Sequence, residues 1–317
     1  MTKVDLIELA AQRRAMLDAI VLDHPAKAEA HEAFQYVIQH ARRRDGKGKL
    51  CVPLIGPSQS GKSTIIESFA QELNTAEALS NRRIPVLHVT LEANVTRKGL
   101  AQNTLEAISE YGFEVAQTGS ESLLHQRVRH FLRLAEVELL VFDEVHHLVN
   151  SESKQLAYSV GETIKRMLIK GVCPIVLSGV SENGEGARRP LENKQLQQRA
   201  VPTVELRKFS RGNPADIMAF SRFLAGYLQE MERQGIASNA PQLTQGDCPA
   251  CILEVSDGVL GATCNLLKEV VRVMTYDGRN DIEHSDLIKA TDQMFVRTGL
   301  ANTNPFLSGP SVIRKVA

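Results

Sequence analysis

The stretch Leu54-Ile55-Gly56-Pro57-Ser58-Gln59-Ser60-Gly61-Lys62-Ser63-Thr64 contains a complete phosphate-loop pattern, two glycines separated by four residues and followed by Lys and Ser. In such a loop the glycines leave backbone N–H groups free to bind phosphate oxygens, next to the positive end of the following helix. Apolar residues predict a strand before the loop and a helix after it. The stretch therefore predicts a nucleoside triphosphate site, whose candidate binding residues are Gly56, Pro57, Ser58, Gln59, Ser60, Gly61, Lys62, Ser63 and Thr64.

Four side chains in two segments have the chemistry that ATP and Mg²⁺ require. Lys62 is a cation that can reach the terminal phosphates, and Ser63 has a hydroxyl expected to ligate Mg²⁺. A second apolar run, Leu139 to Phe142, ends in Asp143 and Glu144. A buried strand would fix Asp143 beside the loop, where it can hold Mg²⁺ through water, and Glu144 could polarise the attacking water. The two segments together predict a nucleoside triphosphatase with Lys62 and Glu144 as candidate catalytic residues.

Three more apolar stretches, residues 85–91, 173–179 and 203–206, predict further strands, and helical patterns separate all of them. Because strands alternate with helices, we expect an α/β P-loop NTPase with a parallel five-stranded sheet covered by helices on both faces. His88 lies inside the second strand, where we expect a hydrogen-bonded core histidine rather than a ligand or a catalytic base.

The order of these patterns divides the chain into four segments. Residues 1–49 form an N-terminal helical segment that ends in a basic linker, and residues 50–208 form the α/β nucleotide-binding core. Residues 209–298 contain helical patterns without strands, including a last helix with Ser285 as its N-cap, and predict a small helical lid. Residues 299–317 are rich in Asn, Gly and Pro and predict a flexible tail.

Polar residues near the fourth and fifth strands complete the candidate site. Ser178 ends the fourth strand, which in ATPases of this type lies between the two phosphate-handling segments and usually carries a polar sensor of the terminal phosphate. In oligomeric ATPases an arginine from the region before the last strand reaches into the neighbouring subunit's site. Arg199 is our candidate for that role, and for Arg188 and Arg189 a solvated loop is an equal alternative.

The composition favours a globular protein, because 317 residues with 43% hydrophobic content can bury a large core. The formal net charge is +0, so any affinity for nucleic acid must come from a local basic patch. The sequence contains no apolar run of membrane length and no signal-peptide core at its charged N-terminus. We therefore expect a cytoplasmic protein with reduced cysteines and no membrane partner.

Three segments resemble the AAA+ ATPases of the TniB/TnsC family, namely Gly56–Ser63, Phe142–Leu148 and Ile175–Gly179. The resemblance runs roughly from His24 to Met294. The family comprises regulators of DNA transposition, including members associated with CRISPR systems. The resemblance implies an AAA+ ATPase that uses ATP and Mg²⁺ and forms a homo-oligomeric ring or filament on double-stranded DNA. It also implies that the protein marks a target site, recruits a transposase and a TniQ-like target-site protein, and disassembles on ATP hydrolysis.

The sequence departs from the family pattern in two places. Val180 stands where relatives commonly have a polar residue, and Ala262-Thr263-Cys264 stand where many AAA+ lids have an arginine. We therefore expect hydrolysis to be slow, which suits a protein whose ATP-bound assembly is itself the signal.

For DNA contact, the stretch after the second strand has the best-placed cations. Arg97 and Lys98 are the candidate DNA-binding residues in an exposed loop, and Arg43 with Arg44 form a second candidate patch. Because the contacts would be to phosphates, binding should depend weakly on sequence and steeply on salt.

Other functions share some of these features. A small-molecule kinase would have the same phosphate loop, but Asp143-Glu144, the helical lid and the arginines between strands disfavour it. A nucleotide-regulated scaffold of the secretion type would bind proteins and never DNA, and a replication-initiation ATPase is a related alternative. A DNA-stimulated ATPase assay distinguishes the transposition regulator, the kinase and the scaffold.

Overall fold

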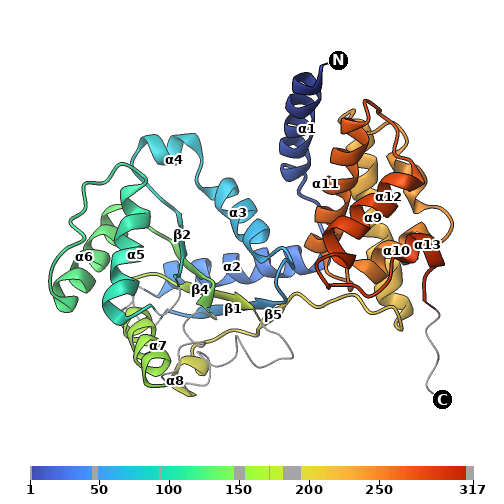
Figure 1. Cartoon of the computed structure of the whole chain (residues 1–317). Helices are drawn as coiled ribbons and strands as arrows, with labels where there is room; N and C mark the ends of the chain where they lie inside the picture. The colour runs from blue at the N-terminus through green and yellow to red at the C-terminus, as the bar shows by residue number, and fades with distance from the viewer. Residues whose placement is uncertain are drawn as a thin grey trace. The chain divides into compact units, whose positions relative to one another are not determined.

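The structure, a computed structural model, describes residues 2–44, 49–92, 95–145, 154–170, 172–180 and 194–311. The chain divides into two compact units (Figure 1). One unit is Pro25–Leu206, and the other combines Met1–His24 with Arg207–Ala317. We call them the sheet unit and the helical unit, because only the first contains the strands that form the sheet.

The sheet of the sheet unit has five strands in the order β2-β3-β4-β1-β5, and every pairing is parallel. The strands are β1 Cys51–Gly56, β2 Val86–Thr90, β3 Leu139–Asp143, β4 Ile175–Val180 and β5 Val204–Glu205. The predicted parallel five-stranded sheet is therefore confirmed. Because all strands point the same way, the carboxyl ends of β1, β3 and β4 meet at one edge of the sheet, where the phosphate loop begins.

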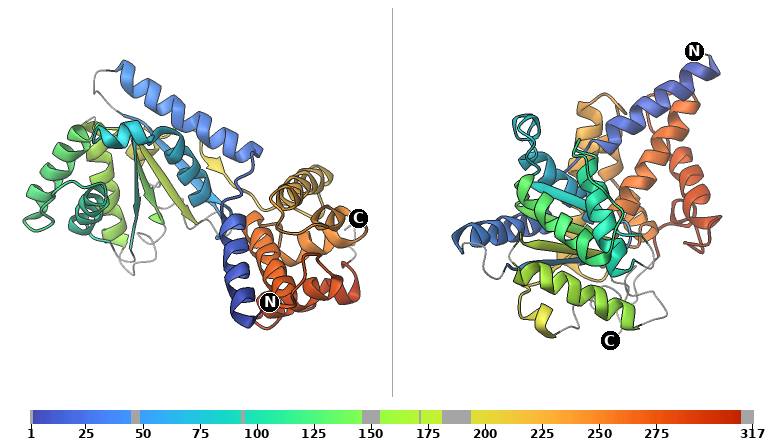
Figure 2. Two further views of the ribbon diagram at one scale, coloured as in Figure 1. Left: turned by 90° about the horizontal axis from the view of Figure 1, so that it is seen from above. Right: turned by 90° about the vertical axis from the view of Figure 1, so that its left-hand side faces the viewer.

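Helices cover both faces of this sheet (Figure 2). The helices of the sheet unit are α2 Pro25–Arg43, α3 Lys62–Leu73, α4 Ala76–Ser80, α5 Arg97–Ser109, α6 Glu121–Leu134, α7 Lys154–Ile169 and α8 Lys194–Gln197. One hydrophobic cluster joins α2 and α3 to one face, and a second joins α5, α6 and α7 to the other. In β3, Leu139 and Val141 belong to the first cluster, whereas Leu140 and Phe142 belong to the second. This alternation explains why the strand is apolar at consecutive positions.

The helical unit is built around its own hydrophobic core. Its elements are α1 Lys3–Asp18, α9 Pro214–Arg233, the 3₁₀ helix η3 Ala240–Thr244, α10 Cys248–Val255, α11 Leu260–Tyr276, α12 His284–Thr291, the π-helix η4 Asp292–Val296 and α13 Pro305–Ser308. The helix α13 lies within the predicted flexible tail, yet its Phe306 is buried in this core.

The N-terminal helix α1 packs within the helical unit although the sequence groups it with α2. Arg13 is buried, and its guanidinium donates hydrogen bonds to Thr275 Oγ1 at 2.8 Å and to the Arg279 carbonyl at 3.2 Å. The Leu17 carbonyl accepts a hydrogen bond from the Tyr227 hydroxyl at 3.2 Å. These contacts join residues more than 200 positions apart, so they depend on tertiary structure that local periodicity does not report.

The expected N-cap of the last predicted helix is wrong. The helix α12 begins at His284, and its N-cap is Glu283, whose backbone N–H donates to Asp286 Oδ2 at 2.9 Å. Ser285 therefore lies inside the first turn.

The described residues contain no single helix with the length and apolar composition needed to cross a membrane. The helices α10 and α11 meet those criteria only as a pair, which is bent by 116°.

Candidate nucleotide-binding site

The phosphate loop connects β1 to α3, and each of its two glycines is required for a different reason. Gly61 is the N-cap of α3 and has φ of 94°, a left-handed conformation that favours glycine. A Cβ at Gly56 would lie 2.7 Å from Ser60 Oγ and 2.8 Å from the Leu206 carbonyl oxygen, so there is no room for a side chain. Gln59 also has a positive φ, of 60°. The loop therefore has the tight curvature that the sequence pattern predicts.

Lys62 extends into this curvature. Its Nζ donates hydrogen bonds to the Pro57 carbonyl at 2.8 Å and the Gly56 carbonyl at 3.1 Å, and the residue is 5% exposed. Burial lowers the pKa of Lys62, while the nearby Asp143 and Glu144 carboxylates raise it. The two carbonyls are neutral acceptors, and charge-assisted hydrogen bonds to phosphate are roughly twice as strong. The ammonium is therefore placed to exchange these acceptors for phosphate oxygens.

Asp143, at the end of β3, is held by groups from three other positions. Ser63 Oγ donates to Asp143 Oδ2 at 2.9 Å, and the Glu144 backbone N–H donates to Oδ1 at 2.9 Å. His88 Nε2, on the adjacent strand β2, lies 3.4 Å from Oδ2. Burial alone would raise the pKa of Asp143, but hydrogen bonds, first among them that from His88, lower it to about 2. The carboxylate is therefore ionised at neutral pH although it is buried.

The oxygen atoms of Ser63 and Asp143 suit a hard divalent cation such as Mg²⁺. Mg²⁺ prefers oxygen ligands, keeps several waters and is usually bound through one or two carboxylates with substrate phosphates. Ser63 and Asp143 supply a hydroxyl and an ionised carboxylate within hydrogen-bond distance of one another. They are therefore the residues that would hold Mg²⁺, and Lys62 with the loop N–H groups would hold the phosphates.

Ser178 lies on β4, the strand between β3 and β1. The residue is fully buried, and its hydroxyl has no hydrogen bond of good geometry, although it is close enough to Asp143 to help lower that pKa. An unsatisfied buried hydroxyl costs about 1–3 kcal/mol. An unpaired hydroxyl close to Asp143 is consistent with contact to a phosphate oxygen.

Glu144 directly follows β3 and is half-buried. Its φ of 61° is left-handed, which is uncommon for a residue with a long side chain. Such strained conformations cost of order 1–3 kcal/mol and cluster at functional sites. His146 and His147, which follow in the sequence, lie outside the described residues.

Arg199 lies at the opposite edge of the sheet from the phosphate loop. The Cys51 backbone N–H donates to the Arg199 carbonyl at 2.9 Å, at the start of β1, whereas the loop follows Gly56 at its end. Five residues of strand at about 3.3 Å each separate these ends by roughly 16 Å. The backbone of Arg199 is therefore remote from the phosphate loop of its own chain. Arg188 and Arg189 lie outside the described residues.

Arg97 and Lys98 are exposed, but they occupy the first turn of α5 rather than a loop, so that part of the expectation is wrong. Thr96 is the N-cap, and its side chain accepts from the Gly99 N–H at 3.0 Å. Arg97 Nε lies 3.4 Å from Glu121 Oε1 on α6. Cations at a helix N-terminus oppose the helix dipole by about 0.3–1 kcal/mol. The stability of α5 therefore does not explain why two cations occupy its first turn.

His88 is the site residue that sequence reasoning did not identify. Its replacement by Ala should lower the free energy of unfolding by about 1–3 kcal/mol, because the buried Asp143 carboxylate loses a donor. Urea denaturation at neutral pH measures this change. His130→Ala, at an exposed position on α6, is the control. Equal losses in the two variants would show that the contact with Asp143 is not stabilising.

Comparison with solved structures shows the fold. The ORC1 protein of Aeropyrum pernix, solved in complex with DNA, aligns with a TM-score of 0.61 and 18% identity over 89% of this chain and 69% of its own. The ADP form of the ORC2 protein from the same organism aligns with a TM-score of 0.63 and 14% identity, over 88% of this chain and 72% of its own. Cdc6p of Pyrobaculum aerophilum aligns with a TM-score of 0.57 and 12% identity, over 88% of this chain and 70% of its own. With the sheet order and the phosphate loop, these similarities identify an AAA+ P-loop NTPase fold.

Among curated proteins none matches this sequence. The family model described as bacterial TniB protein matches residues 16–209, which is more than half of the 317 residues. The same range contains the phosphate loop and every side chain that the structure gathers around Asp143. The chain therefore belongs to the bacterial TniB family.

Proposed function

We propose that the protein is an ATP-hydrolysing AAA+ regulator of DNA transposition. It assembles as a homo-oligomer on duplex DNA, marks the target site, recruits a transposase and a TniQ-like protein, and disassembles on ATP hydrolysis. The observation that carries the ATPase activity is the contact of Ser63 with the ionised, buried Asp143 beside Lys62. Membership of the TniB family supports the role in transposition.

Each side chain of the site has a separate role in this proposal. Lys62 and the loop N–H groups bind the phosphates, and Ser63 with Asp143 holds Mg²⁺. When bound, Mg²⁺ neutralises charge on the phosphate oxygens. Glu144 orients and polarises the attacking water, and Ser178 donates its unpaired hydroxyl to a terminal phosphate oxygen. Arg199 of the adjacent subunit stabilises charge on the transferring phosphoryl group.

The proposed contact with DNA involves Arg97 and Lys98. Both side chains are exposed, and the exposed ion pair of Arg97 with Glu121 is of a kind worth only about 0–1 kcal/mol, so a phosphate can replace Glu121. The adjacent helix N-terminus adds to the attraction for anions. The similar ORC1 protein was solved in complex with DNA, which agrees with this proposal. Because the chain has a net charge of +0, several subunits must act together to bind firmly.

The double change Arg97→Ala with Lys98→Ala should weaken duplex binding and reduce its salt dependence, while leaving ATP binding intact. The slope of log affinity against log salt should become shallower by about 0.9 for each DNA phosphate that the variant no longer neutralises. Fluorescence anisotropy of a labelled duplex over a salt series, with and without a non-hydrolysable ATP analogue, measures it.

A matched control is Lys3→Ala with Arg133→Ala, which removes the same charge from two other exposed positions. Arg43→Ala with Arg44→Ala tests the second candidate patch. If the wild-type protein shows no ATP-dependent binding to duplex at low salt, the protein-scaffold alternative becomes the better function.

A further inference from the structure

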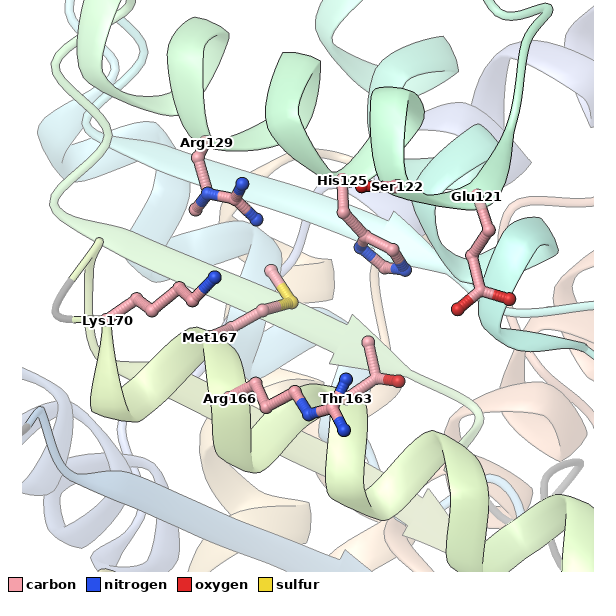
Figure 3. A pocket seen from close by; sticks show the side chains of 8 residues that line it. All are labelled: Glu121, Ser122, His125, Arg129, Thr163, Arg166, Met167 and Lys170. Atoms are coloured by element: carbon pink, nitrogen blue, oxygen red, sulfur yellow. The ribbon is translucent and has the colours of Figure 1, made fainter.

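A polar cavity lies between α6 and α7, on the face of the sheet covered by α5, α6 and α7 (Figure 3). Its volume is about 190 Å³, more than ten times the roughly 10–15 Å³ that one water needs. It is lined by Glu121, Ser122, His125, Arg129, Thr163, Arg166, Met167 and Lys170. None of these residues takes part in the nucleotide site described above. We call this cavity the α6–α7 pocket.

Basic side chains from both helices converge on the α6–α7 pocket. His125 and Arg129 extend into it from α6, and Arg166 and Lys170 extend into it from the opposite side (Figure 3). Each pair has the i,i+4 spacing that places both side chains on one helix face; the Lys170 N–H donates to the Arg166 carbonyl at 2.9 Å, which continues the helical geometry. Like charges at this spacing destabilise a helix by about 0.2–0.5 kcal/mol. The helices themselves therefore gain nothing from the Arg166–Lys170 arrangement.

The charges in the pocket are not balanced by acids. Among the described residues, Arg129, Arg166 and Lys170 have no carboxylate within ion-pair distance. Glu121 is the one carboxylate among the described lining residues, and it pairs with Arg97 on α5 at 3.4 Å. Three permanent cations thus face a cavity that a polyatomic anion can enter.

His125 adds a buried ring nitrogen to the lining of the pocket. Its Nε2 is buried and has no hydrogen-bond partner among the described residues. Burial lowers the pKa of His125, whereas Glu121 and a hydrogen bond with the Arg97 backbone act in the opposite direction. Whenever Nε2 carries a proton, it can donate one hydrogen bond to an anion. A buried donor without an acceptor is costly by itself, and an anion in the pocket would supply the acceptor.

We propose that the α6–α7 pocket binds a phosphate group. Guanidinium groups bind phosphate through two parallel hydrogen bonds, which Arg129 and Arg166 can provide, and Lys170 adds a point charge. The Ser122 and Thr163 hydroxyls line the same cavity. The phosphate can come from a nucleic acid backbone or from a small phosphorylated molecule.

The geometry favours the nucleic acid backbone as the source. Through the contact of Glu121 with Arg97, one end of the pocket adjoins the exposed turn that carries Arg97 and Lys98. The basic surface proposed for DNA and the pocket are therefore adjacent. This choice of source rests on the DNA binding proposed above, whereas the binding of a phosphate group does not.

The first arm of the test measures phosphate alone. Lys62→Ala serves as the background, because it removes the lysine that would bind phosphate in the phosphate loop. In this background, inorganic phosphate should raise the melting temperature of the full chain relative to chloride at equal ionic strength. Adding Arg166→Gln with Lys170→Gln should remove that increase. Both positions are exposed, so the substitutions should not prevent folding.

The second arm measures duplex DNA with the otherwise unsubstituted protein and an ATP analogue. Arg166→Gln with Lys170→Gln should make the salt slope shallower by about 0.9 for each DNA phosphate that the pocket no longer neutralises. The matched control Lys3→Gln with Arg133→Gln makes the same change in net charge outside the pocket and should leave the slope unchanged.

The outcomes separate the two claims. Removal of the phosphate effect with an unchanged DNA slope would support the pocket and identify a small phosphorylated molecule as its ligand. If wild-type protein binds no duplex, the proposed function fails, and the phosphate arm alone decides the pocket. Two results together would overturn the proposed phosphate pocket. The first is that phosphate raises the melting temperature equally with and without the Arg166 and Lys170 substitutions. The second is that these substitutions leave the DNA salt slope unchanged, or change it no more than the control does.

Discussion

Replacing Arg199 with Ala is expected to lower ATP turnover by roughly 10³-fold or more while leaving the chain folded and able to bind ATP. The reason is the position of Arg199 in the sheet unit. Its backbone is hydrogen-bonded to the first residue of β1, whereas the phosphate loop follows the last. We therefore expect Arg199 to serve the site of an adjacent subunit. Steady-state phosphate release by the assembled protein measures the effect.

Mixing two variants tests whether Arg199 acts between subunits. Subunits with Lys62→Ala cannot use their own site but retain Arg199, so an excess of them should partly restore turnover to the Arg199→Ala protein. Arg133→Ala, which removes an exposed arginine from α6, is the control and should keep wild-type turnover. An absence of rescue in mixtures shown to co-assemble would indicate that Arg199 has only a structural role.

Replacing Glu144 with Gln is expected to lower turnover by about 10²–10⁴-fold, the usual contribution of a positioned general base. ATP binding and assembly should persist, because Lys62, Ser63 and Asp143 remain in place. Gln keeps the size of the side chain and removes only its ability to accept a proton. Nucleotide affinity and single-turnover hydrolysis, measured on the same preparation, separate the two steps.

The contrasting variant is Lys62→Ala, which should abolish ATP binding because the loop loses its cation directed at the phosphates. Turnover is then absent for a different reason, the loss of ATP binding. If Glu144→Gln hydrolyses ATP at the wild-type rate, the role assigned to Glu144 is wrong.

Much of the sheet unit could be predicted from the sequence because its decisive features are local. The strand β3 is buried on both faces, which leaves an uninterrupted apolar run ending in Asp143. The phosphate loop needs glycine at Gly56 because neighbouring atoms crowd it, and at Gly61 because of its positive φ. The positive φ of Gly61 and the crowding of Gly56 by Ser60 act within a few residues of sequence, so the pattern reports them directly, whereas the crowding of Gly56 by Leu206 depends on tertiary structure.

The remaining features depend on which elements become neighbours. His88 meets Asp143 because β2 pairs with β3 in a register that sets Thr90 opposite Asp143, and no periodicity in either segment specifies that pairing. The α6–α7 pocket requires two helices from distant segments to face each other. Arg97 and Lys98 are a different case, since Thr96 as N-cap was visible in the sequence and could have identified the start of α5.

If Arg199 completes the site of an adjacent subunit, as proposed, its separation from the phosphate loop of its own chain gives the assembly a direction. If each chain supplies an arginine on one side and accepts one on the other, the contact is heterologous, and it generates a closed ring or an open helical filament. In a ring every ATP site is complete. In a filament one terminal subunit always lacks a donor, so its ATP persists while sites inside the polymer turn over. The two ends of such a filament would then differ in lifetime, and the polymer would shorten unequally from its ends.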